Sequence, residues 1–219
     1  MKNIIVIGAS GHSKVIVDIL EKSGKWNILG YIDSFKTEST FFGYPILGTE
    51  KDISAISKEK TIFGGVISIG DNWTRFQMME KIKENSPDFK FISAIHPNAI
   101  LGRGVKVGNG SVIMAGAILN PDSEIGMHSI INTSSIIEHD SKVGDFSTIS
   151  PNVAIGGNVK VGNFSTIGIS ATLKHGVEIE DDVVIGANSV VLNNIKKNSM
   201  AYGIPAKIIR NRKRSETYL

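Results

Sequence analysis

The sequence predicts an α/β domain with a small parallel, Rossmann-like sheet over residues 1–96, followed by a parallel β-helix of hexapeptide repeats over residues 97–219. Two observations lead to this prediction. Before Pro97, short apolar runs alternate with segments of helical periodicity, which is typical of a parallel sheet with crossover helices. After Pro97, an aliphatic residue returns at every sixth position, a period that belongs to β-helices.

The first domain is expected to begin with a buried strand, followed by a helix that ends at Gly24. Its last helix is amphipathic, and either Asp71 or Asn72 caps it. The elements between them are predicted from shorter apolar runs. Together, the predicted strands cover residues 3–8, 26–33, 61–70 and 89–95, and the predicted helices cover residues 15–24, 52–57 and 71–86.

The second domain is predicted from its strict period of six residues. Neither an α-helix nor an ordinary β-strand repeats in this way. In a hexapeptide β-helix, each side contributes one inward aliphatic side chain and one small residue at the corner. The repeat has no break, so we expect no inserted loop. The aliphatic positions are Leu101, Val107, Ile113, Leu119, Ile125, Ile131, Ile137, Val143, Ile149, Ile155, Val161, Ile167, Leu173, Ile179, Ile185 and Val191.

The composition excludes several classes of protein. The chain has no cysteine, which excludes disulfides, thiolate metal sites and an acyl-cysteine intermediate, and we expect no metal. No apolar run reaches the roughly 18 residues of a membrane span and no signal peptide is evident, so a cytoplasmic protein without a membrane partner is expected. The net charge is only +3, and the basic tail at residues 210–219 is interpreted as a solvated end rather than a nucleic-acid arm.

Within the apolar repeat, the segment INTSSIIEHD at residues 131–140 carries a histidine beside a carboxylate. A histidine can accept a proton near neutral pH, which suits a general base in group transfer to an amine or hydroxyl. The rigid edge of a solenoid would hold His139 and Asp140 in place. The alternative is an exposed pair without a function.

The segment GASGH, from Gly8 to His12, is a glycine turn between a strand and a helix. Such a turn leaves backbone N–H groups at the helix N-terminus free to bind phosphate. The spacing is not that of a dinucleotide fingerprint, because Ser10 and Ser13 occupy its second and third glycine positions, so NAD is not expected. Asp33 closes the second strand, where it either binds the same ligand or forms a turn.

The chain resembles the NeuD/PglD group of hexapeptide-repeat sugar O- and N-acetyltransferases. The resemblance covers almost the whole chain and rests on VIGASGH, SIGDNWTR, INTSSIIEHD, GNVKVG and YGIPAKIIR. It implies a left-handed β-helix, a homotrimer with active sites between neighbouring subunits, and acetyl-CoA as the acyl donor.

The resemblance also implies roles for individual residues. His139 is the general base, Asp140 steadies its ring, and Asn132 lies near the reacting groups, although an asparagine ladder inside the solenoid is equally compatible with its position. The residues implied to bind the nucleotide-linked sugar are Gly8, Ser10, Gly11, His12, Asp33, Ser34, Gly70, Asn72 and Arg75. For Asn72, a role as helix cap is the alternative.

Coenzyme A is expected along the C-terminal coils, where small residues keep the wall low enough for a pantetheine chain. Glycines that merely turn corners, and a solvated tail, are the alternatives. The positions that match the coenzyme A site of the family it resembles are Gly168, Ile169, Gly186, Ala187 and Lys207. Arg210 is a further candidate for phosphate contact.

The predicted function is N-acetylation of the amino group of a nucleotide-linked amino-deoxy sugar in surface glycan biosynthesis. A sialic-acid-type O-acetyltransferase and an inactive nucleotide-sugar-binding scaffold are the alternatives. His175 lies 36 residues, or two coils, after His139. With stacked strands about 4.8 Å apart, their backbones should be about 10 Å apart, too far for a hydrogen-bonded dyad. We therefore expect His175 on the solenoid surface or beside the coenzyme A groove, with catalysis as the minority alternative.

Overall fold

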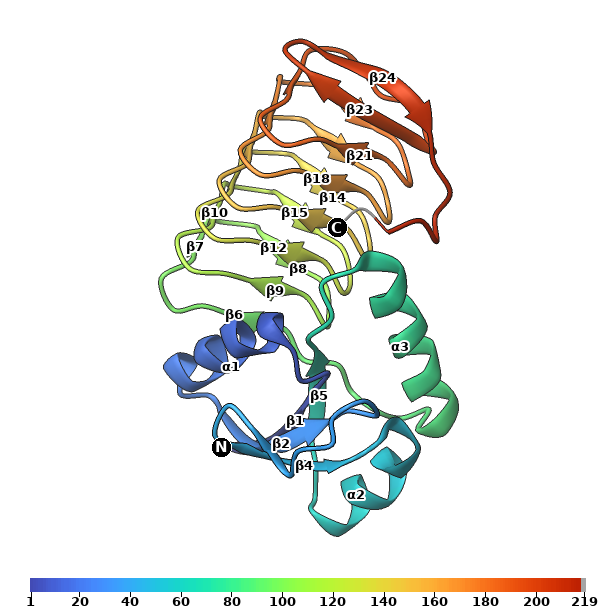
Figure 1. Cartoon of the computed structure of the whole chain (residues 1–219). Helices are drawn as coiled ribbons and strands as arrows, with labels where there is room; N and C mark the ends of the chain where they lie inside the picture. The colour runs from blue at the N-terminus through green and yellow to red at the C-terminus, as the bar shows by residue number, and fades with distance from the viewer. Residues whose placement is uncertain (218–219) are drawn as a thin grey trace.

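The computed structural model describes residues 1–217 and contains an α/β domain stacked on one end of a β-helix (Figure 1). Tyr218 and Leu219, which the predicted second domain includes, lie outside the described residues. Within residues 1–217, no helix is long and apolar enough to cross a membrane.

The N-terminal sheet has five strands in the order β3-β4-β2-β1-β5. Strand β1 pairs in parallel with β2 and with β5, as expected from the alternating pattern. The hairpin of β3 and β4 is antiparallel and was not predicted, because its strands are short and lack a clear apolar period. The strands are β1 Lys2–Ile7, β2 Trp26–Ile32, β3 Thr40–Phe41, β4 Tyr44–Gly48 and β5 Gly64–Ile67.

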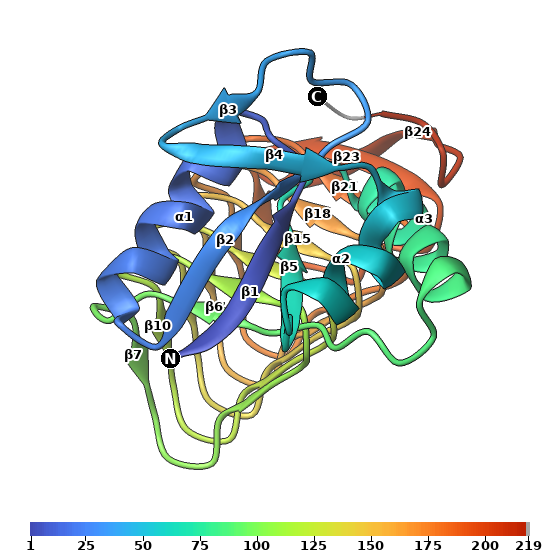
Figure 2. The same cartoon turned by 90° about the horizontal axis from the view of Figure 1, so that it is seen from below.

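The helices of this domain lie on both faces of the sheet (Figure 2). Alternate residues of β1 point to opposite faces: Ile4 packs in the cluster that includes α1, and Ile5 in the cluster that includes α2 and α3. The helices are α1 Gly11–Ser23, the short 3-10 helix η1 Glu50–Asp52, α2 Ile53–Glu59 and α3 Asn72–Asn85.

The helix ends follow the predicted signals. Gly24 ends α1 in the left-handed conformation, with φ of 63°, which glycine adopts without strain. Asp71 caps α3, since its side chain accepts a hydrogen bond from the backbone N–H of Thr74 at 2.8 Å. Of the two predicted caps, Asp71 is the observed one.

The β-helix confirms the predicted hexapeptide repeat. Each coil has three two-residue strands, and strands 18 residues apart pair in parallel without a register shift, as Ile118 does with Ile136. The three sheets are called here face C (β6, β9, β12, β15, β18, β21), face D (β7, β10, β13, β16, β19, β22) and face E (β8, β11, β14, β17, β20). No loop interrupts the coils, and the fold is a left-handed parallel β-helix.

The strand bounds follow the repeat. Those of face C are Ala94–Ile95, Val112–Ile113, Ile130–Ile131, Thr148–Ile149, Thr166–Ile167 and Val184–Ile185. Those of face D are Ile100–Leu101, Ile118–Leu119, Ile136–Ile137, Ala154–Ile155, Thr172–Leu173 and Val190–Val191. Those of face E are Lys106–Val107, Glu124–Ile125, Lys142–Val143, Lys160–Val161 and Glu178–Ile179.

Serines at one corner of the β-helix form a buried hydrogen-bond ladder. The hydroxyl of Ser129 accepts from the backbone N–H of Ser147 at 3.1 Å and donates to the carbonyl of Gly144 at 2.7 Å. Ser147 repeats this pattern one coil later. A small side chain that both donates and accepts therefore satisfies backbone groups that would otherwise be buried without partners.

Both ends of the β-helix depart from the simple repeat. Residues 89–95 were predicted as a last strand of the first domain. Phe91 does form an isolated parallel bridge with Gly65 of β5, but the strand β6 at Ala94–Ile95 pairs with β9 of face C. The reason is that Ile95 lies six residues before Leu101 and already belongs to the aliphatic period. At the other end, β23 Ser199–Gly203 and β24 Ala206–Asn211 form an antiparallel hairpin that covers the last coil (Figure 1).

The described part of the basic tail is packed against the protein, which corrects its interpretation as a solvated end. Arg214 donates two hydrogen bonds to Asp182, at 2.8 and 2.7 Å, and its guanidinium lies 4.3 Å from the ring centre of Phe164. Arg212 is 7% exposed and donates to the carbonyl of Asp182. A planar cation can pair with a carboxylate and stack on an aromatic ring at once, so these arginines fasten the tail.

Candidate active site

A cavity of about 550 Å³ lies where the N-terminal domain meets face C of the β-helix. Its wall brings together residues that are up to 190 positions apart in the sequence. Seven of the predicted site residues line it: His12, Gly70, Asn132, Gly168, Ile169, Gly186 and Ala187.

The position of this cavity follows from the sheet topology. Strand β2 lies on one side of β1 and β5 on the other, so the strand order reverses at β1, and ligands of α/β sheets bind beyond the carboxyl ends of strands at such a point. Gly8 and Ser68 follow β1 and β5 there, and a β-carbon on Gly8 would lie 3.3 Å from the hydroxyl of Ser68. Glycine at this turn therefore allows the two loops to approach closely.

His12 presents a partly buried, neutral imidazole to the cavity. Burial and, secondarily, the positive charge of Arg75 lower the pKa of His12 to about 4. Its Nε2 atom is buried and has no hydrogen-bond partner among the described residues. A bound ligand could supply the missing partner, which fits the predicted position of the substrate.

Asp33 holds the glycine turn against the loop after β2. One carboxylate oxygen accepts from the N–H of Ala9 at 2.6 Å, and the other accepts from the N–H groups of Phe35 and Lys36 at 2.7 and 3.0 Å. These contacts are those of a turn-forming residue, and contact of Asp33 with a nucleotide remains a prediction. The hydroxyl of Ser34 donates to the carboxylate of Glu50.

Asn72 and Arg75 connect the two domains. Asn72 donates to Thr166 and accepts from Thr148, both on face C. Arg75 is 1% exposed and donates to the carbonyls of His128, Ile69 and Gly70 and to the side chain of Asn72. Neither residue is among those that line the cavity, and their observed partners are protein groups. Direct substrate contact by Asn72 or Arg75 stays untested.

The imidazole of His139 is held by Asp140, with Nδ1 and a carboxylate oxygen 2.7 Å apart. Asp140 adopts a left-handed backbone, with φ of 60°, which aspartate tolerates better than most residues. An ionised carboxylate can only accept, so Nδ1 carries the hydrogen and Nε2 is left free to take up a proton. The side chain of His139 is 53% exposed.

The ring of His139 extends along the β-helix over Gly157, one coil further on. A β-carbon on Gly157 would lie 2.7 Å from Nε2 of His139. Beyond Gly157, the ring of His175 has its centre 6.4 Å from that of His139. As predicted, His139 and His175 lie two coils apart along the β-helix, and they form no hydrogen-bonded dyad in the structure.

Within one chain, His139 does not line the cavity. It lies on the corner between faces D and E, whereas Asn132 lies on the corner between faces C and D. Asn132 lines the cavity and also donates to the backbone carbonyl of Ile149 in the next coil, at 2.9 Å. It belongs to no asparagine ladder, since Met114 and Ser150 occupy its position in the coils before and after. The structure of one chain therefore separates the candidate base from the candidate binding cavity.

At the C-terminal end of the cavity, the glycines have packing reasons for their size. A β-carbon on Gly168 would lie 2.6 Å from the carbonyl oxygen of Ile185 in the next coil. On Gly186, it would overlap the ring of Tyr202, at 1.8 Å. Lys207 is exposed on β24 and does not line the cavity, and Arg210 pairs with Glu216.

The comparisons with known proteins agree with this architecture. The model of the PglD N-terminal domain matches residues 3–82, and the bacterial transferase hexapeptide model, of six repeats, matches residues 158–193. A histidine-to-asparagine mutant of perosamine N-acetyltransferase from Caulobacter crescentus, solved with CoA and GDP-perosamine, is 31% identical with a TM-score of 0.89, covering 96% of this chain and 98% of that one. The chain belongs to the NeuD/PglD family of sugar acetyltransferases.

Two further members of this family resemble the chain. The acetyltransferase domain of PglB from Neisseria gonorrhoeae FA1090, in complex with acetyl coenzyme A, is 30% identical with a TM-score of 0.87, covering 95% of this chain and 99% of that one. UDP-N-acetylbacillosamine N-acetyltransferase of Bacillus subtilis (strain 168) is 32% identical over 123 residues. That match spans 52% of this chain and 52% of the relative.

Several contacts of this NeuD/PglD-type site were not predicted from the sequence. Tyr202 lines the cavity, although only its motif, YGIPAKIIR, was singled out, and Thr148 and Thr166 line it from face C. The signal for the threonines was present: the outward positions of face C are aliphatic at Val112 and Ile130 and change to threonine in the next two coils. The first two are covered by the cluster that contains α1, and the threonines bond Asn72.

Proposed function

We propose that the protein transfers the acetyl group of acetyl-CoA to the amino group of a nucleotide-linked amino-deoxy sugar, in surface glycan biosynthesis. The observation that carries this proposal is the single cavity whose wall combines His12 and Gly70, from the nucleotide-type domain, with Asn132 and Gly168, from the β-helix. A ligand in this cavity contacts both domains at once. Relatives named as N-acetyltransferases of perosamine and N-acetylbacillosamine support the choice of an amine acceptor.

In this proposal, the sugar amine attacks the thioester carbonyl directly. The new C–N bond forms, the C–S bond breaks, and coenzyme A leaves with the sulfur. The nitrogen must lose a proton in this step, and Nε2 of His139 accepts it while Asp140 holds Nδ1. The chain has no cysteine to carry the acetyl group covalently, which supports direct transfer.

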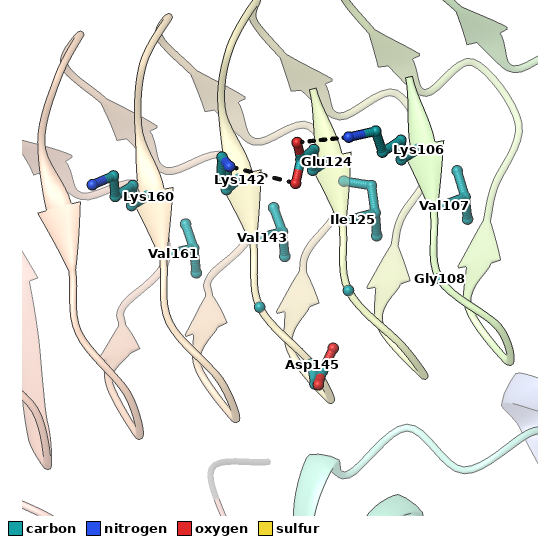
Figure 3. Close-up of a pocket in the computed structure, with 12 residues that line it drawn as sticks. Lys106, Val107, Gly108, Glu124, Ile125, Lys142, Val143, Asp145, Lys160 and Val161 are labelled. Carbon is teal, nitrogen blue, oxygen red and sulfur yellow. Dashed lines mark hydrogen bonds and ion pairs between the residues drawn. The ribbon is translucent and has the colours of Figure 1, made fainter. Parts of the chain in front are cut away.

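The separation of His139 from its own cavity supports a homotrimer in which a neighbouring subunit supplies the base. The outward residues of face D offer an apolar surface for this contact, since Ile100 is 60% exposed and Ile118 and Ile136 are partly exposed. Face E is different: Glu124 pairs with Lys106 and Lys142 across its outer surface (Figure 3). Burying the apolar face D between copies and leaving the charged face E in water is the arrangement with the lowest cost in free energy.

The proposed reaction is placed in the cytoplasm, where thioesters of coenzyme A and nucleotide-linked sugars are made. Acetyl-CoA is proposed to lie along Gly168, Ile169, Gly186 and Ala187, which line one end of the cavity together with Tyr202. The volume of the cavity, about 550 Å³, is sufficient for a pantetheine arm.

A panel of UDP-, dTDP- and GDP-linked amino sugars tests the function. At least one should raise the Tm of the protein, since a ligand that binds the native state stabilises it by mass action, and should release coenzyme A from acetyl-CoA. Turnover with CMP-sialic acid instead would favour the O-acetyltransferase, and binding without turnover would favour the scaffold.

A second experiment tests the assembly. Light scattering on the purified protein should give the mass of three chains. Ile118→Glu should dissociate this assembly and abolish turnover, because it places a charge on face D. The matched control, Lys160→Glu at an outward position of face E, should keep both. A fully active Ile118→Glu monomer would contradict the shared site.

A further inference from the structure

We propose that the C-terminal tail sets the position of helix α3 at the cavity, with Arg214 as its positioning residue. This inference rests on the proposed function and adds a residue that acts on nucleotide-sugar binding from outside the cavity. After β24 the chain turns back toward α3 (Figure 1), and the guanidinium carbon of Arg214 lies 6.0 Å from the ring centre of Trp73. The tail therefore reaches the first turn of α3, which begins shortly after the cavity residue Gly70.

The place of Arg214 is fixed by one corner of the β-helix. The corner residue is His128, Phe146 and Phe164 in three successive coils and Asp182 in the next, all with a left-handed backbone of φ 53° to 58°. The three rings stack along the corner, and the carboxylate of Asp182 ends the stack. Arg214 donates two hydrogen bonds to Asp182 and lies 4.3 Å from the ring centre of Phe164. Its guanidinium therefore continues the stack beyond the last ring.

Helix α3 packs on the same aromatic stack. The ring of Phe76 makes edge-to-face contacts with Phe146 and Phe164, at 5.3 and 5.5 Å between centres. Trp73 stacks on Phe76 at 5.1 Å and lies 6.0 Å from Phe164. Arg214 thus faces one ring from the β-helix and one from α3. Because a cation is attracted to both rings, it favours their observed arrangement where the two domains meet.

The first turn of α3 transmits its position to the cavity. Gly70 lines the cavity, and Arg75 donates to its carbonyl at 2.8 Å, so the loop before the helix moves with the turn. Asn72 holds one side of this turn through its hydrogen bonds to face C. Successive residues of a helix point about 100° apart, so Trp73 faces another direction and meets the tail there. Two contacts in different directions fix the rotation of the helix about its axis.

Steady-state kinetics on tail variants tests this role. Arg214→Ala should raise KM for the nucleotide-linked sugar about fivefold, the equivalent of about 1 kcal/mol, while kcat and KM for acetyl-CoA stay the same. Arg214→Lys keeps the charge but loses the paired hydrogen bonds and the planar stack, so its KM should lie in between. The matched control Lys213→Ala, at an exposed neighbour in the tail, should behave as the unmodified protein does.

Further variants separate this role from stability. The side chain of Arg214 is 43% exposed, so its removal leaves no internal cavity, but it leaves the buried carboxylate of Asp182 unpaired. Arg214→Ala combined with Asp182→Asn avoids that charge and should show the same rise in KM. Trp73→Leu should raise KM as well, and adding Arg214→Ala to it should raise KM no further, because both changes break one contact.

The fluorescence of Trp73 tests the contact without turnover. The chain has two tryptophans, so Trp26→Phe leaves Trp73 as the only one. In this background, Arg214→Ala should shift the emission to longer wavelength and increase quenching by acrylamide, because the ring loses part of its cover. Lys213→Ala should change neither quantity.

Each contrary result has a distinct meaning. If Arg214→Ala lowers Tm but leaves KM for the nucleotide-linked sugar unchanged, the tail only stabilises the fold and the inference is overturned. A rise in KM for acetyl-CoA alone overturns it as well, and in both cases the proposed function survives. If the unmodified protein turns over no nucleotide-linked amino sugar, the proposed function fails. The emission and quenching of Trp73 then decide whether the tail holds α3, and unchanged values overturn the inference too.

Discussion

Gly157 lies directly under the imidazole of His139: a β-carbon at Gly157 would be 2.7 Å from Nε2 and 2.9 Å from Cε1 of the ring. Real β-carbons do not approach other atoms so closely. The ring is the end of a side chain and can move, so an alanine at residue 157 is compatible with the fold. It is not compatible with the observed position of the nitrogen that is proposed to accept the proton.

Gly157→Ala should therefore lower kcat by about tenfold or more, because a displacement of about 1 Å in a reacting group can cost up to 10²-fold. The loss should appear in kcat more than in KM, because the substitution displaces the base and leaves the residues that line the cavity unchanged. Steady-state kinetics measures this directly. As a control, the same substitution in a His139→Ala background should cause no further loss, and a fully active Gly157→Ala variant would contradict the proposal.

His139→Ala should lower kcat by about 10² to 10⁴-fold, the usual cost of a lost general base, with acetyl-CoA affinity nearly unchanged. Asp140→Asn should cost less, because it removes the orientation of the ring but leaves the base. Single-turnover kinetics and calorimetry separate the two effects. Near-normal turnover of His139→Ala would exclude this mechanism.

His175→Ala should reduce turnover much less than His139→Ala. The centres of the two rings are 6.4 Å apart, and Gly157 occupies the coil between them, so His175 cannot act as the partner of His139 in a hydrogen-bonded dyad. Parallel kinetics on both variants decide the point. An equally complete loss with intact coenzyme A binding would identify His175 as a second essential group.

Arg75→Lys should act mainly on stability. A lysine cannot reproduce the fork of hydrogen bonds to three carbonyls and Asn72, and losing charged hydrogen bonds in a buried place should cost about 2 kcal/mol or more of unfolding free energy. Denaturant unfolding measures this cost. If Arg75 contacts the substrate instead, KM for the nucleotide sugar should rise while the unfolding free energy stays unchanged.

His128→Phe should make the protein less sensitive to acid. Burial, and then the charges of Arg75 and Lys83, lower the pKa of His128 to about 3, against 6.5 for an unperturbed histidine. Between these values the unfolded state binds more protons than the folded state, so stability falls as the pH drops from about 6.5 toward 3. His12, with its pKa near 4, contributes in the same direction.

Phenylalanine fits this position because Phe146 and Phe164 occupy it in the next two coils, with φ of 53° and 56° against 53° for His128. The ring of His128 stacks on that of Phe146, with centres 5.0 Å apart, and the ring of Phe146 stacks on that of Phe164, with centres 5.4 Å apart. Tm measured from pH 7 to pH 4 should therefore fall less in His128→Phe than in the unmodified protein. Identical slopes would show that His128 is not part of the acid response.

The sequence predicts most reliably those features that a single element determines. The aliphatic period of six specifies the faces of the β-helix because each residue only has to point inward, and Gly24 and Asp71 end or begin their helices locally. Contacts between elements are different. The burial of Arg75 and the packing of Arg214 on Phe164 depend on how two domains and a tail meet, which no local period encodes.

The candidate site shows the same division. His139 and Asp140 are neighbours in the chain, so their contact could be predicted, and the sequence motifs contain three of the seven predicted residues that line the cavity, His12, Gly70 and Asn132. The steric demand for glycine at residue 157 emerges only from the structure, although a residue 18 positions after His139 must lie one coil away. The place of Tyr202 over Gly186 depends on the fold of the terminal hairpin and had no signal of its own.

Because each coil has 18 residues and no loop is inserted, the β-helix can change its length only by whole coils. Adding one whole coil lengthens the molecule by a single strand spacing of about 4.8 Å and leaves every later side chain on its original face. Adding six residues moves each later residue to the next face, so the charged row that starts at Lys106 would replace an apolar one. Viable insertions and deletions in the β-helix should therefore come in multiples of 18 residues, that is, in whole coils.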